Sequence, residues 1–472
     1  MITLQQAIDQ INKANPFFGK FLNCDTPLKQ YCKENLTSHE FNPIHLKRQE
    51  PYVELIKEKI DKLFPEENLN INYDEGMICD TSAHHNLINF PAIIGTHTLS
   101  RFETILDREN YGDYYVLDTS NVTLSEVLHK RGVEFAGKHL NLFPKKDKNV
   151  LVSKYPLYKF DLMDWINKTG HQYTKQELDF IKRLQKIIDK IDFSTCERFA
   201  DQVVKINYYI WLEFFDPKIR DKARRCITLE HDEILIKYLK TFLIENKDNF
   251  VWKALFDEKW RKVVLKEFDK VYGAWNYSGL DTGTYFFWAI DNKGKRYRLD
   301  LKDNKLIEKG GNIRDIELTP EDIIKALNEG IITPSIFTKF SLVNCYMGAK
   351  VMGGPGQTDY VPKIKEAWLR VLENLDPEEA KLVEQVSVYN MNGADIAFHR
   401  TKDGKLFREW GFDTAKNHTF SEEYLEKLGN MPIKYAVMPF TPLSYYRLTP
   451  AEERQKIDYN EQDLYQGFEW VK

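Results

Sequence analysis

The stretch from residue 90 to residue 119, FPAIIGTHTLSRFETILDRENYGDYYVLDT, decides the fold class that we predict for this chain. Two short apolar segments, 90–97 and 114–119, flank about 16 residues whose apolar side chains recur at helical spacing. Strands joined by a helical crossover are parallel neighbours in one sheet. We therefore expect these two segments to be neighbouring strands of an α/β fold with a layered sheet.

The sequence pattern changes twice along the chain. Residues 1–160 alternate apolar and helical segments, whereas residues 161–275 carry apolar side chains at i, i+3, i+4 and i+7 with few glycines. Beyond residue 276 the alternation returns, with hairpin signals around 292–294 and 403–404. The pattern predicts an α/β core in two parts, 1–160 and 276–472, a largely helical subdomain between them, and small β-hairpins.

Composition excludes several classes of protein. The 472 residues are 42% hydrophobic and 13% aromatic, which is typical of a globular chain and not of a disordered one. A net charge of −4 gives no basic field for a nucleic-acid backbone. No apolar run approaches the roughly 18 residues of a membrane span, and the N-terminal residues do not resemble a signal peptide.

The six cysteines are scattered and form no CxxC pair, which fits reduced thiols better than disulfides or a structural zinc site. We therefore expect a cytoplasmic protein with a small-molecule partner and without nucleic-acid or membrane partners. The sequence gives no signal for an oligomeric state.

A glycine-rich loop interrupts the stretch GAKVMGGPGQTDYVPKIKEAW (348–368). It precedes a helix that we expect to begin near Tyr360, and a helix N-terminus with bare N–H groups suits a phosphate or carboxylate. A simple turn capped by Asp359 is the alternative, but three glycines exceed what such a turn needs. The anion-binding candidates in this loop are Gly353, Gly354, Gly356, Gln357 and Thr358.

Histidines gather in the stretch CDTSAHHNLINFPAIIGTHTLSR (79–101). Asp80, His84 and His85 could bind a metal ion, but adjacent histidines usually diverge and no HExxH spacing is present. We favour a loop in which His84 and His85 reach a polar substrate, and we expect no bound metal. Thr96 and His97 would lie at the carboxyl end of the first predicted strand, where ligands bind in open α/β sheets.

A third polar group, Asp118 to Asn121, follows the second predicted strand at its carboxyl end. We expect His84, His85 and Asp118 to be the catalytic groups of one cleft. Thr96, His97 and Asn121 would bind the substrate there, together with the glycine-rich loop. Ser-His-Asp catalysis is not expected, because the chain has no GxSxG elbow.

The loop reading Gly353-Gly354-Pro355-Gly356-Gln357-Thr358-Asp359-Tyr360 resembles the GGPGE…Y loop of the bacillithiol-synthase family, the putative cysteine-adding enzymes. The helical segment before it, with Pro334 and Cys345, is also similar. Where that family has Glu-Asp-His-Asp after a strand, this chain has Asp118-Thr119-Ser120-Asn121, and Gln357 replaces the loop glutamate. The resemblance implies a Rossmann-like core with helical insertions and a nucleotide or amino-sugar pocket.

The function expected from the resemblance is that of a small-molecule ligase or transferase. It would join an amine-bearing substrate to a polar anionic partner that is nucleotide-like or sugar-like, with a nucleotide as the possible cofactor. One alternative is a metal-dependent hydrolase that uses Asp80, His84 and His85. Another is a non-catalytic ligand-binding or scaffold protein.

Overall fold

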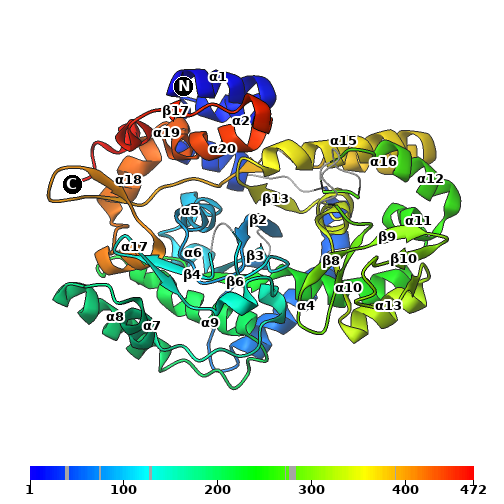
Figure 1. Ribbon diagram of the computed structural model, residues 1–472, viewed down its shortest axis with the longest axis horizontal. Helices are drawn as coiled ribbons and strands as arrows, with labels where there is room; N and C mark the ends of the chain where they lie inside the picture. Colours follow the sequence, from blue (N-terminus) through cyan, green and yellow to red (C-terminus); the bar gives the residue numbers. More distant parts are fainter. Residues whose placement is uncertain (38–41, 74–75, 127–129, 272, 276–282, 389) are drawn as a thin grey trace.

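A five-stranded parallel sheet lies at the centre of the molecule (Figure 1). Its spatial order is β14 (Asn390–Met391), β13 (Lys350–Gly353), β2 (Ile78–His84), β3 (Tyr114–Thr119) and β6 (Cys226–Glu230). All four neighbouring pairs are parallel. The chain builds outward from β2 to β3 and β6 and then continues on the other side with β13 and β14. The protein is therefore a mixed α/β protein whose strand order reverses between β2 and β13.

The computed structural model describes residues 1–37, 42–73, 76–126, 130–271, 273–275, 283–388 and 390–472, with residues 37 and 80–82 described as backbone only. The α-helices are α1 (Leu4–Ala14), α2 (Pro16–Leu22), α3 (Leu28–Tyr31), α4 (Pro43–Leu63), α5 (Pro91–Leu99), α6 (Arg108–Tyr111), α7 (Leu162–Thr169), α8 (Lys175–Ile188), α9 (Phe199–Trp211), α10 (His231–Glu245), α11 (Phe250–Phe256), α12 (Glu258–Glu267), α13 (Pro320–Glu329), α14 (Ile336–Lys339), α15 (Gln357–Leu375), α16 (Pro377–Glu384), α17 (Gly411–Asn417), α18 (Glu422–Asn430), α19 (Ile433–Val437) and α20 (Thr441–Leu448). Two π-helical segments are η1 (Cys32–Thr37) and η7 (Phe340–Tyr346).

Segment 90–97 is a helix, so its prediction as a strand was wrong. Eight of the nine residues of α5 are buried, and a helix that is apolar on all sides shows no 3.6-residue period. Pro91 at its first position was the start signal for a helix. The segment 114–119 is a strand, β3, as predicted, but its parallel neighbour is β2.

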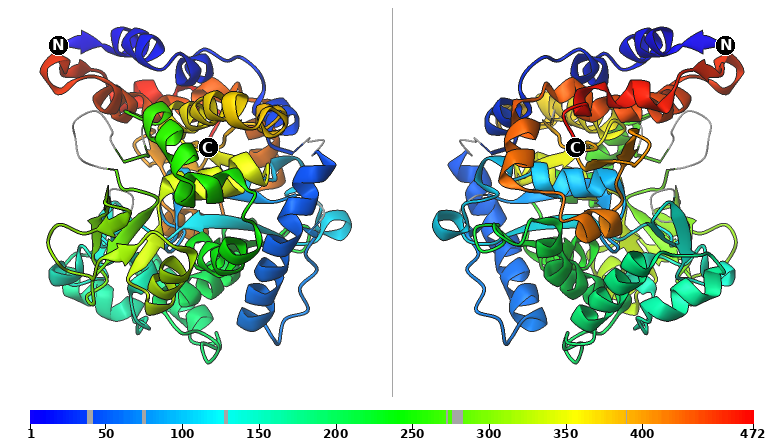
Figure 2. Two further views of the ribbon diagram at one scale, coloured as in Figure 1. Left: turned by 90° about the vertical axis from the view of Figure 1, so that its right-hand side faces the viewer. Right: turned by 90° about the vertical axis from the view of Figure 1, so that its left-hand side faces the viewer.

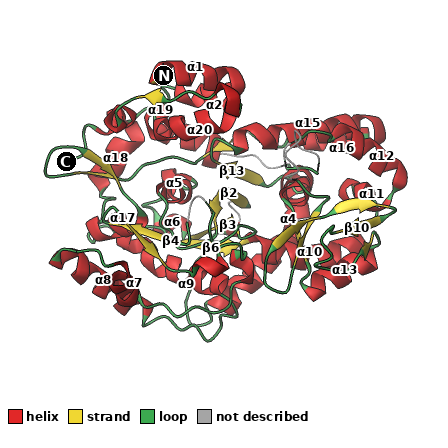
Figure 3. Cartoon of the chain, viewed as in Figure 1, coloured by secondary structure: helices red, strands yellow, loops and turns green. Residues whose placement is uncertain are grey.

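Both faces of the central sheet are covered by helices, as Figure 3 shows around the short strands. Alternate side chains of the strands enter two separate hydrophobic cores, which is the pattern of a buried parallel sheet. One core joins Tyr114 and Val116 to α5 and α9. The other joins Tyr115 and Leu117 to α4 and α10.

The remaining strands form small sheets. They are β1 (Ile2–Thr3) with β17 (Ile457–Asp458); β4 (Gly132–Phe135) with β5 (Lys138–Asn141); β7 (Phe287–Ile290) with β8 (Arg296–Arg298) and β12 (Ile332–Pro334); β9 (Asp300–Lys302) with β10 (Lys305–Ile307) and β11 (Ile316–Glu317); and β15 (Phe398–Arg400) with β16 (Leu406–Arg408). The antiparallel pairs β7–β8 and β15–β16 confirm the two predicted hairpins. Segment 161–275 contains α7 to α12, and it also supplies the edge strand β6 of the central sheet.

The first and last parts of the chain lie side by side (Figure 2). Strand β1 pairs with β17 in parallel, with Ile2 opposite Ile457. Helix α1 packs against α20, which follows the central sheet in the chain. Among the described helices, none is both long enough and apolar enough to cross a bilayer.

Candidate functional site

A cavity of about 620 Å³ opens at the carboxyl edge of the central sheet. We call it the sheet-edge cavity. His84 lines it from the end of β2, Thr119 and Asn121 from the end of β3, Gly354 from beyond β13 and Gly393 from beyond β14. The cavity therefore lies where the strand order reverses, which is the usual ligand position in open α/β sheets.

An ion pair between Lys339 and Asp232 contributes to the wall of the cavity. Lys339 Nζ lies 2.9 Å from Asp232 Oδ1 and 2.9 Å from Thr119 Oγ1. Asp232 Oδ2 also accepts hydrogen bonds from the backbone N–H groups of Ser120 (2.7 Å) and Asn121 (2.9 Å). Burial alone would raise the pKa of Asp232, but the Lys339 ammonium and these hydrogen bonds lower it to about 2. Asp232 is therefore a carboxylate at neutral pH.

Two arginines and a further carboxylate face the same cavity. Arg296 of β8 donates to the backbone oxygen of Asn121 at 2.7 Å, and its guanidinium carbon lies 4.4 Å from the centre of the Trp288 ring. Arg447 of α20 and Glu126 also line the cavity. With Lys339 and Asp232, the wall carries three cationic and two anionic side chains.

Asn121 presents a buried acceptor at the cavity. Asn121 is 8% exposed, and its Nδ2 donates to the Pro334 carbonyl at 2.9 Å. No described residue donates to Asn121 Oδ1. A buried acceptor without a donor costs free energy, so this oxygen suits a hydroxyl or N–H group of a bound ligand.

The glycine-rich loop forms part of the cavity wall through Gly354, Gly356 and Gln357. Helix α15 begins at Gln357, three residues before the predicted start. The described φ angles place none of the three loop glycines in the left-handed region. A Cβ at Gly353 would lie 1.6 Å from Gln357 Oε1, and one at Gly356 would lie 2.4 Å from Arg447 Nη1. Two of the glycines thus give room to side chains of the protein itself.

Thr358 lies outside the cavity. Its hydroxyl donates to the Pro355 carbonyl at 2.7 Å and accepts from Asn15 Nδ2 at 3.3 Å. Asn15 is the residue before α2. Thr358 therefore connects the glycine-rich loop to the N-terminal helices, and Gly353 is likewise not part of the cavity lining.

His84 and His85 point to different surroundings. His84 lines the cavity, and burial lowers its pKa to about 4, so its imidazole is neutral at pH 7. His85 is fully buried, and its Nε2 donates to the Ala200 carbonyl of α9 at 2.9 Å. The Asp80 side chain lies outside the described part of the chain. The two imidazoles therefore do not converge on one point.

His85, His97 and Asp118 form a buried cluster behind the cavity wall. His97 Nδ1 donates to the Ile93 carbonyl at 2.8 Å, and its Nε2 lies 3.1 Å from Asp118 Oδ1. His85 Nδ1 lies 3.8 Å from Asp118 Oδ2. Burial lowers the pKa of His97 to about 3, so the imidazole is neutral at pH 7.

Thr96 is also buried in this region, where its hydroxyl donates to the Ile93 carbonyl at 2.8 Å. None of Thr96, His97, His85 and Asp118 lines the sheet-edge cavity. The reason is that Thr96 and His97 lie in the last turn of α5 and not at the end of a strand. Among the suggested residues whose side chains or glycine positions the structure describes, the cavity thus brings together only His84, Asn121, Gly354, Gly356 and Gln357.

Sequence reasoning missed the charged residues of the cavity. Asp232 lies two residues beyond the end of β6, as Asn121 lies two residues beyond the end of β3. That signal was present in CITLEHDE (226–233), but it lies in a segment that we took as helical. Lys339, Arg296 and Arg447 come from a short helix, a hairpin and a late helix, and no local pattern marks them.

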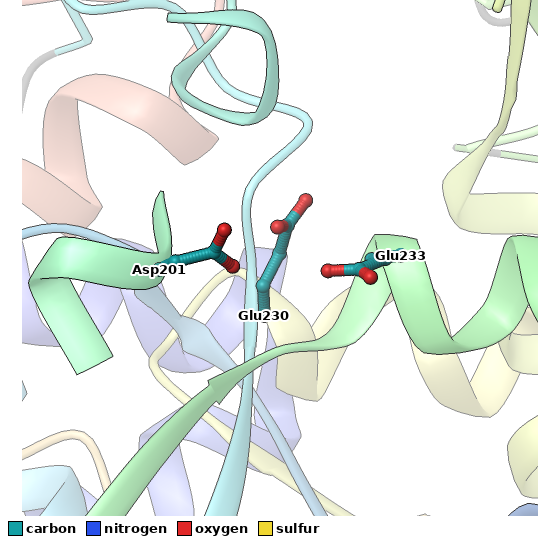
Figure 4. A group of neighbouring side chains, drawn as sticks. All are labelled: Asp201, Glu230 and Glu233. Carbon is teal, nitrogen blue, oxygen red and sulfur yellow. The ribbon is translucent and has the colours of Figure 1, made fainter. Parts of the chain in front are cut away.

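Three carboxylates converge beside the cavity: Asp201 of α9, Glu230 at the end of β6 and Glu233 of α10 (Figure 4). Two cations already lie among them. Lys59 Nζ is 2.6 Å from Asp201 Oδ1 and 2.5 Å from Glu233 Oε2. Arg198 Nη2 is 2.8 Å from Glu230 Oε2 and 2.6 Å from Glu233 Oε2. We interpret the group as a buried ion-pair network, because a metal ion here would compete with Lys59 and Arg198.

Ser120 connects this network to the cavity wall. Its hydroxyl oxygen lies 2.7 Å from Glu230 Oε1 and 2.9 Å from Asp232 Oδ2. A hydroxyl has one proton, so Ser120 donates to one of these two carboxyl groups at a time. Burial raises the pKa of Glu230, and the guanidinium of Arg198 opposes that shift.

No protein-family model and no curated protein matches this chain.

Proposed function

We propose that this chain is a small-molecule ligase or transferase. It would join an amine-bearing substrate to a polar anionic partner that is nucleotide-like or sugar-like. One observation carries the proposal: three cationic and two anionic side chains face one cavity at the carboxyl edge of a parallel sheet. Such a wall can hold an anion and an ammonium group together, and bringing two reactants together supplies much of the rate of a bond-forming enzyme.

The strand order supports a Rossmann-like core. In chain order the strands are arranged 5-4-1-2-3, with the reversal between the first and the fourth strand. This order occurs in doubly wound folds, in which nucleotides bind at the reversal. The loop that resembles the bacillithiol-synthase family forms part of the cavity wall at this point, which supports an activity related to that of the family.

The charged residues suggest separate roles. Lys339, Arg296 and Arg447 would bind the anionic partner, with the N-terminus of α15 nearby. Asp232 stays ionised at neutral pH and would hold the ammonium group of the other substrate. For the two to join, the amine nitrogen would lose a proton and attack the anionic partner, and the bond from that partner to its phosphate would break so that phosphate leaves. Glu126 and His84 are further titratable groups on the wall that could accept the proton.

A binding experiment with a matched control tests the anion site. Isothermal titration calorimetry would compare sugar phosphates and nucleotides with the wild type, Arg296→Gln and Arg298→Gln. Arg298 lies two residues further on β8 but pairs with Asp300 at 2.8 Å and is not part of the cavity lining. We expect Arg296→Gln to weaken binding about tenfold or more, because a charge-assisted hydrogen bond is worth about 1.5–3 kcal/mol. Equal loss in both variants, or no binding by the wild type, would contradict the proposal.

A second experiment tests bond formation. The protein would be incubated with a bound anion and a mixture of amino acids and amino sugars, and mass spectrometry would search for a joined product. A product that is absent with Asp232→Asn supports the ligase or transferase. Binding without any product would favour the non-catalytic alternative.

A further inference from the structure

We propose that the ligand of the sheet-edge cavity is an amphipathic anion. Its charged head would bind at Lys339 and Arg296, and an apolar body would extend from the head across the exposed apolar residues of the cavity wall. This inference rests on the proposed anion site and adds the chemical class of the rest of the molecule.

The buried part of the wall includes charged and polar residues, and its exposed part carries apolar residues beside two arginines, Arg296 and Arg447. Lys339, Asp232 and Asn121 are only 2%, 1% and 8% exposed. Leu443 and Tyr446, by contrast, are 54% and 41% exposed. Both groups line the same cavity. A ligand that contacts the buried groups and reaches solvent can therefore contact Lys339 and Asp232 at one end, and at the other end both apolar residues and exposed arginines.

The exposed residues come from two separate helices. Ile336, which is 38% exposed, belongs to α14, whereas Leu443 and Tyr446 belong to α20. We call these three residues the apolar rim. Exposed apolar side chains that gather at one cavity usually mark a binding surface.

Aromatic side chains line the cavity as well. Phe90, Trp288, Phe340 and Phe440 all contribute to its wall, and Trp288 stacks under the guanidinium of Arg296. The apolar surface therefore begins beside the proposed head group. A wholly polar sugar or amino acid would leave this surface and the apolar rim in contact with water, whereas an alkyl chain or an aromatic base would cover them.

Alkyl phosphates of increasing length test the proposal. Calorimetry would measure methyl, butyl and octyl phosphate, below the concentration at which octyl phosphate forms micelles, and adenosine monophosphate as an aromatic member. A buried methylene contributes about 0.8 kcal/mol, so we expect affinity to rise up to about fourfold for each methylene that reaches the apolar wall. Tighter binding of the nucleotide than of butyl phosphate would identify the body as an aromatic base.

Variants distinguish the residues that bind the charged head of the ligand from those that bind its apolar body. We expect Leu443→Ser with Tyr446→Ser to remove the dependence on chain length while leaving methyl phosphate binding unchanged. Arg296→Gln should weaken all four ligands by a similar factor. Ile244→Ser is the control, because Ile244 is 61% exposed on α10 and does not line the cavity. Thermal melting of each variant would confirm that it is folded.

The outcomes distinguish the two proposals. If no phosphate binds, the proposed anion site is wrong and this inference fails with it. If methyl and octyl phosphate bind equally, the anion site stands and the amphipathic ligand is wrong. Chain-length dependence that survives the rim variant would place the apolar body elsewhere. A rim variant that changes only the sedimentation of the protein would identify the rim as a contact between copies of the chain.

Discussion

Lys339 and Asp232 stabilise each other as a buried ion pair, and we propose that they also bind the ligand. The second role weakens the first. Removing two charges from water is costly, and their attraction offsets that cost only while both partners are present. The same two groups are also among the charged residues that the cavity offers to a ligand. A ligand that binds Lys339 must therefore also compensate for the weakened contact with Asp232.

Lys339→Met tests the strength of this coupling. The substitution leaves the Asp232 carboxylate buried without its cation, and we expect it to reduce the free energy of unfolding by about 3–5 kcal/mol. Lys339→Met combined with Asp232→Asn should recover much of that loss, because the Asn side chain can still accept from the N–H groups of Ser120 and Asn121. Urea denaturation measures both variants. A double variant that is less stable than the single one would refute the coupling.

The buried histidines predict how stability depends on pH. Burial lowers the pKa of His84 to about 4 and of His97 to about 3, below the ordinary value of 6.5. The unfolded chain therefore binds more protons than the native protein below pH 6.5, so these histidines reduce stability as pH falls. The cost from each histidine should grow from about 0.7 kcal/mol per pH unit at pH 6.5 toward about 1.4 kcal/mol per pH unit near pH 5, as the unfolded histidine becomes fully protonated.

Urea denaturation at several pH values checks this expectation. Other groups titrate in the same range, so the informative quantity is the difference in slope between the wild type and His97→Gln. We expect the variant to lose stability less steeply between pH 6.5 and pH 5. Parallel curves for the two proteins would show that His97 is not buried as a neutral group.

At the scale of elements, the glycine-rich loop packs so closely against Arg447 that position 356 has no room for a side chain unless Arg447 moves. Gly356 admits the guanidinium of Arg447, which is the end of a flexible side chain and can move. We expect Gly356→Ala to change the free energy of unfolding by less than about 1 kcal/mol and to weaken anion binding by displacing Arg447.

A double-mutant cycle with Arg447→Gln measures that displacement. If Gly356→Ala acts through Arg447, it should weaken anion binding in the wild type and have little further effect in Arg447→Gln. Additive losses would mean that the backbone of the loop contacts the ligand directly, as the glycine content alone suggested.

Elements with a strong local signal could be predicted from the sequence. The turns at Gly294 and Gly404 identified two hairpins, and a short apolar segment identified β3. Helix α5 could not be identified by periodicity, because it is buried on nearly all sides. Strand β6 was missed because five residues lie between long helical patterns.

The sequence could predict only some of the residues that line the cavity. Residues at strand ends, such as His84 and Asn121, were suggested by position alone, because a parallel sheet gathers its carboxyl ends. Lys339, Arg296 and Arg447 reach the cavity from elements whose placement depends on the tertiary fold. Local pattern could not predict that placement.

At the scale of the whole molecule, buried charges form a continuous network from α4 to the cavity. Lys59 of α4 and Arg198 neutralise the carboxylates of Asp201, Glu230 and Glu233, and Ser120 links Glu230 to Asp232. The cations already in this network leave no need for a metal ion to balance its charge.

We expect protein purified without added metal to contain no stoichiometric zinc, iron or manganese, as measured by plasma mass spectrometry. Metal at 1:1 that disappears in His84→Ala with His85→Ala would favour the hydrolase. Metal that disappears in Glu230→Gln with Glu233→Gln would place an ion among the carboxylates.

The π-helical segment η7, which begins directly after Lys339, has an evolutionary consequence. A π-turn holds about one more residue than an α-turn and is less favourable, and such turns are common at functional sites. Deleting Val343 would let the segment relax into a regular α-helix. It would also change the register between Lys339 and the residues that follow by about 100°, since an α-helix has 3.6 residues per turn. We expect the shortened protein to melt at a higher temperature and to lose the anion site, so selection for stability alone would have removed the extra residue.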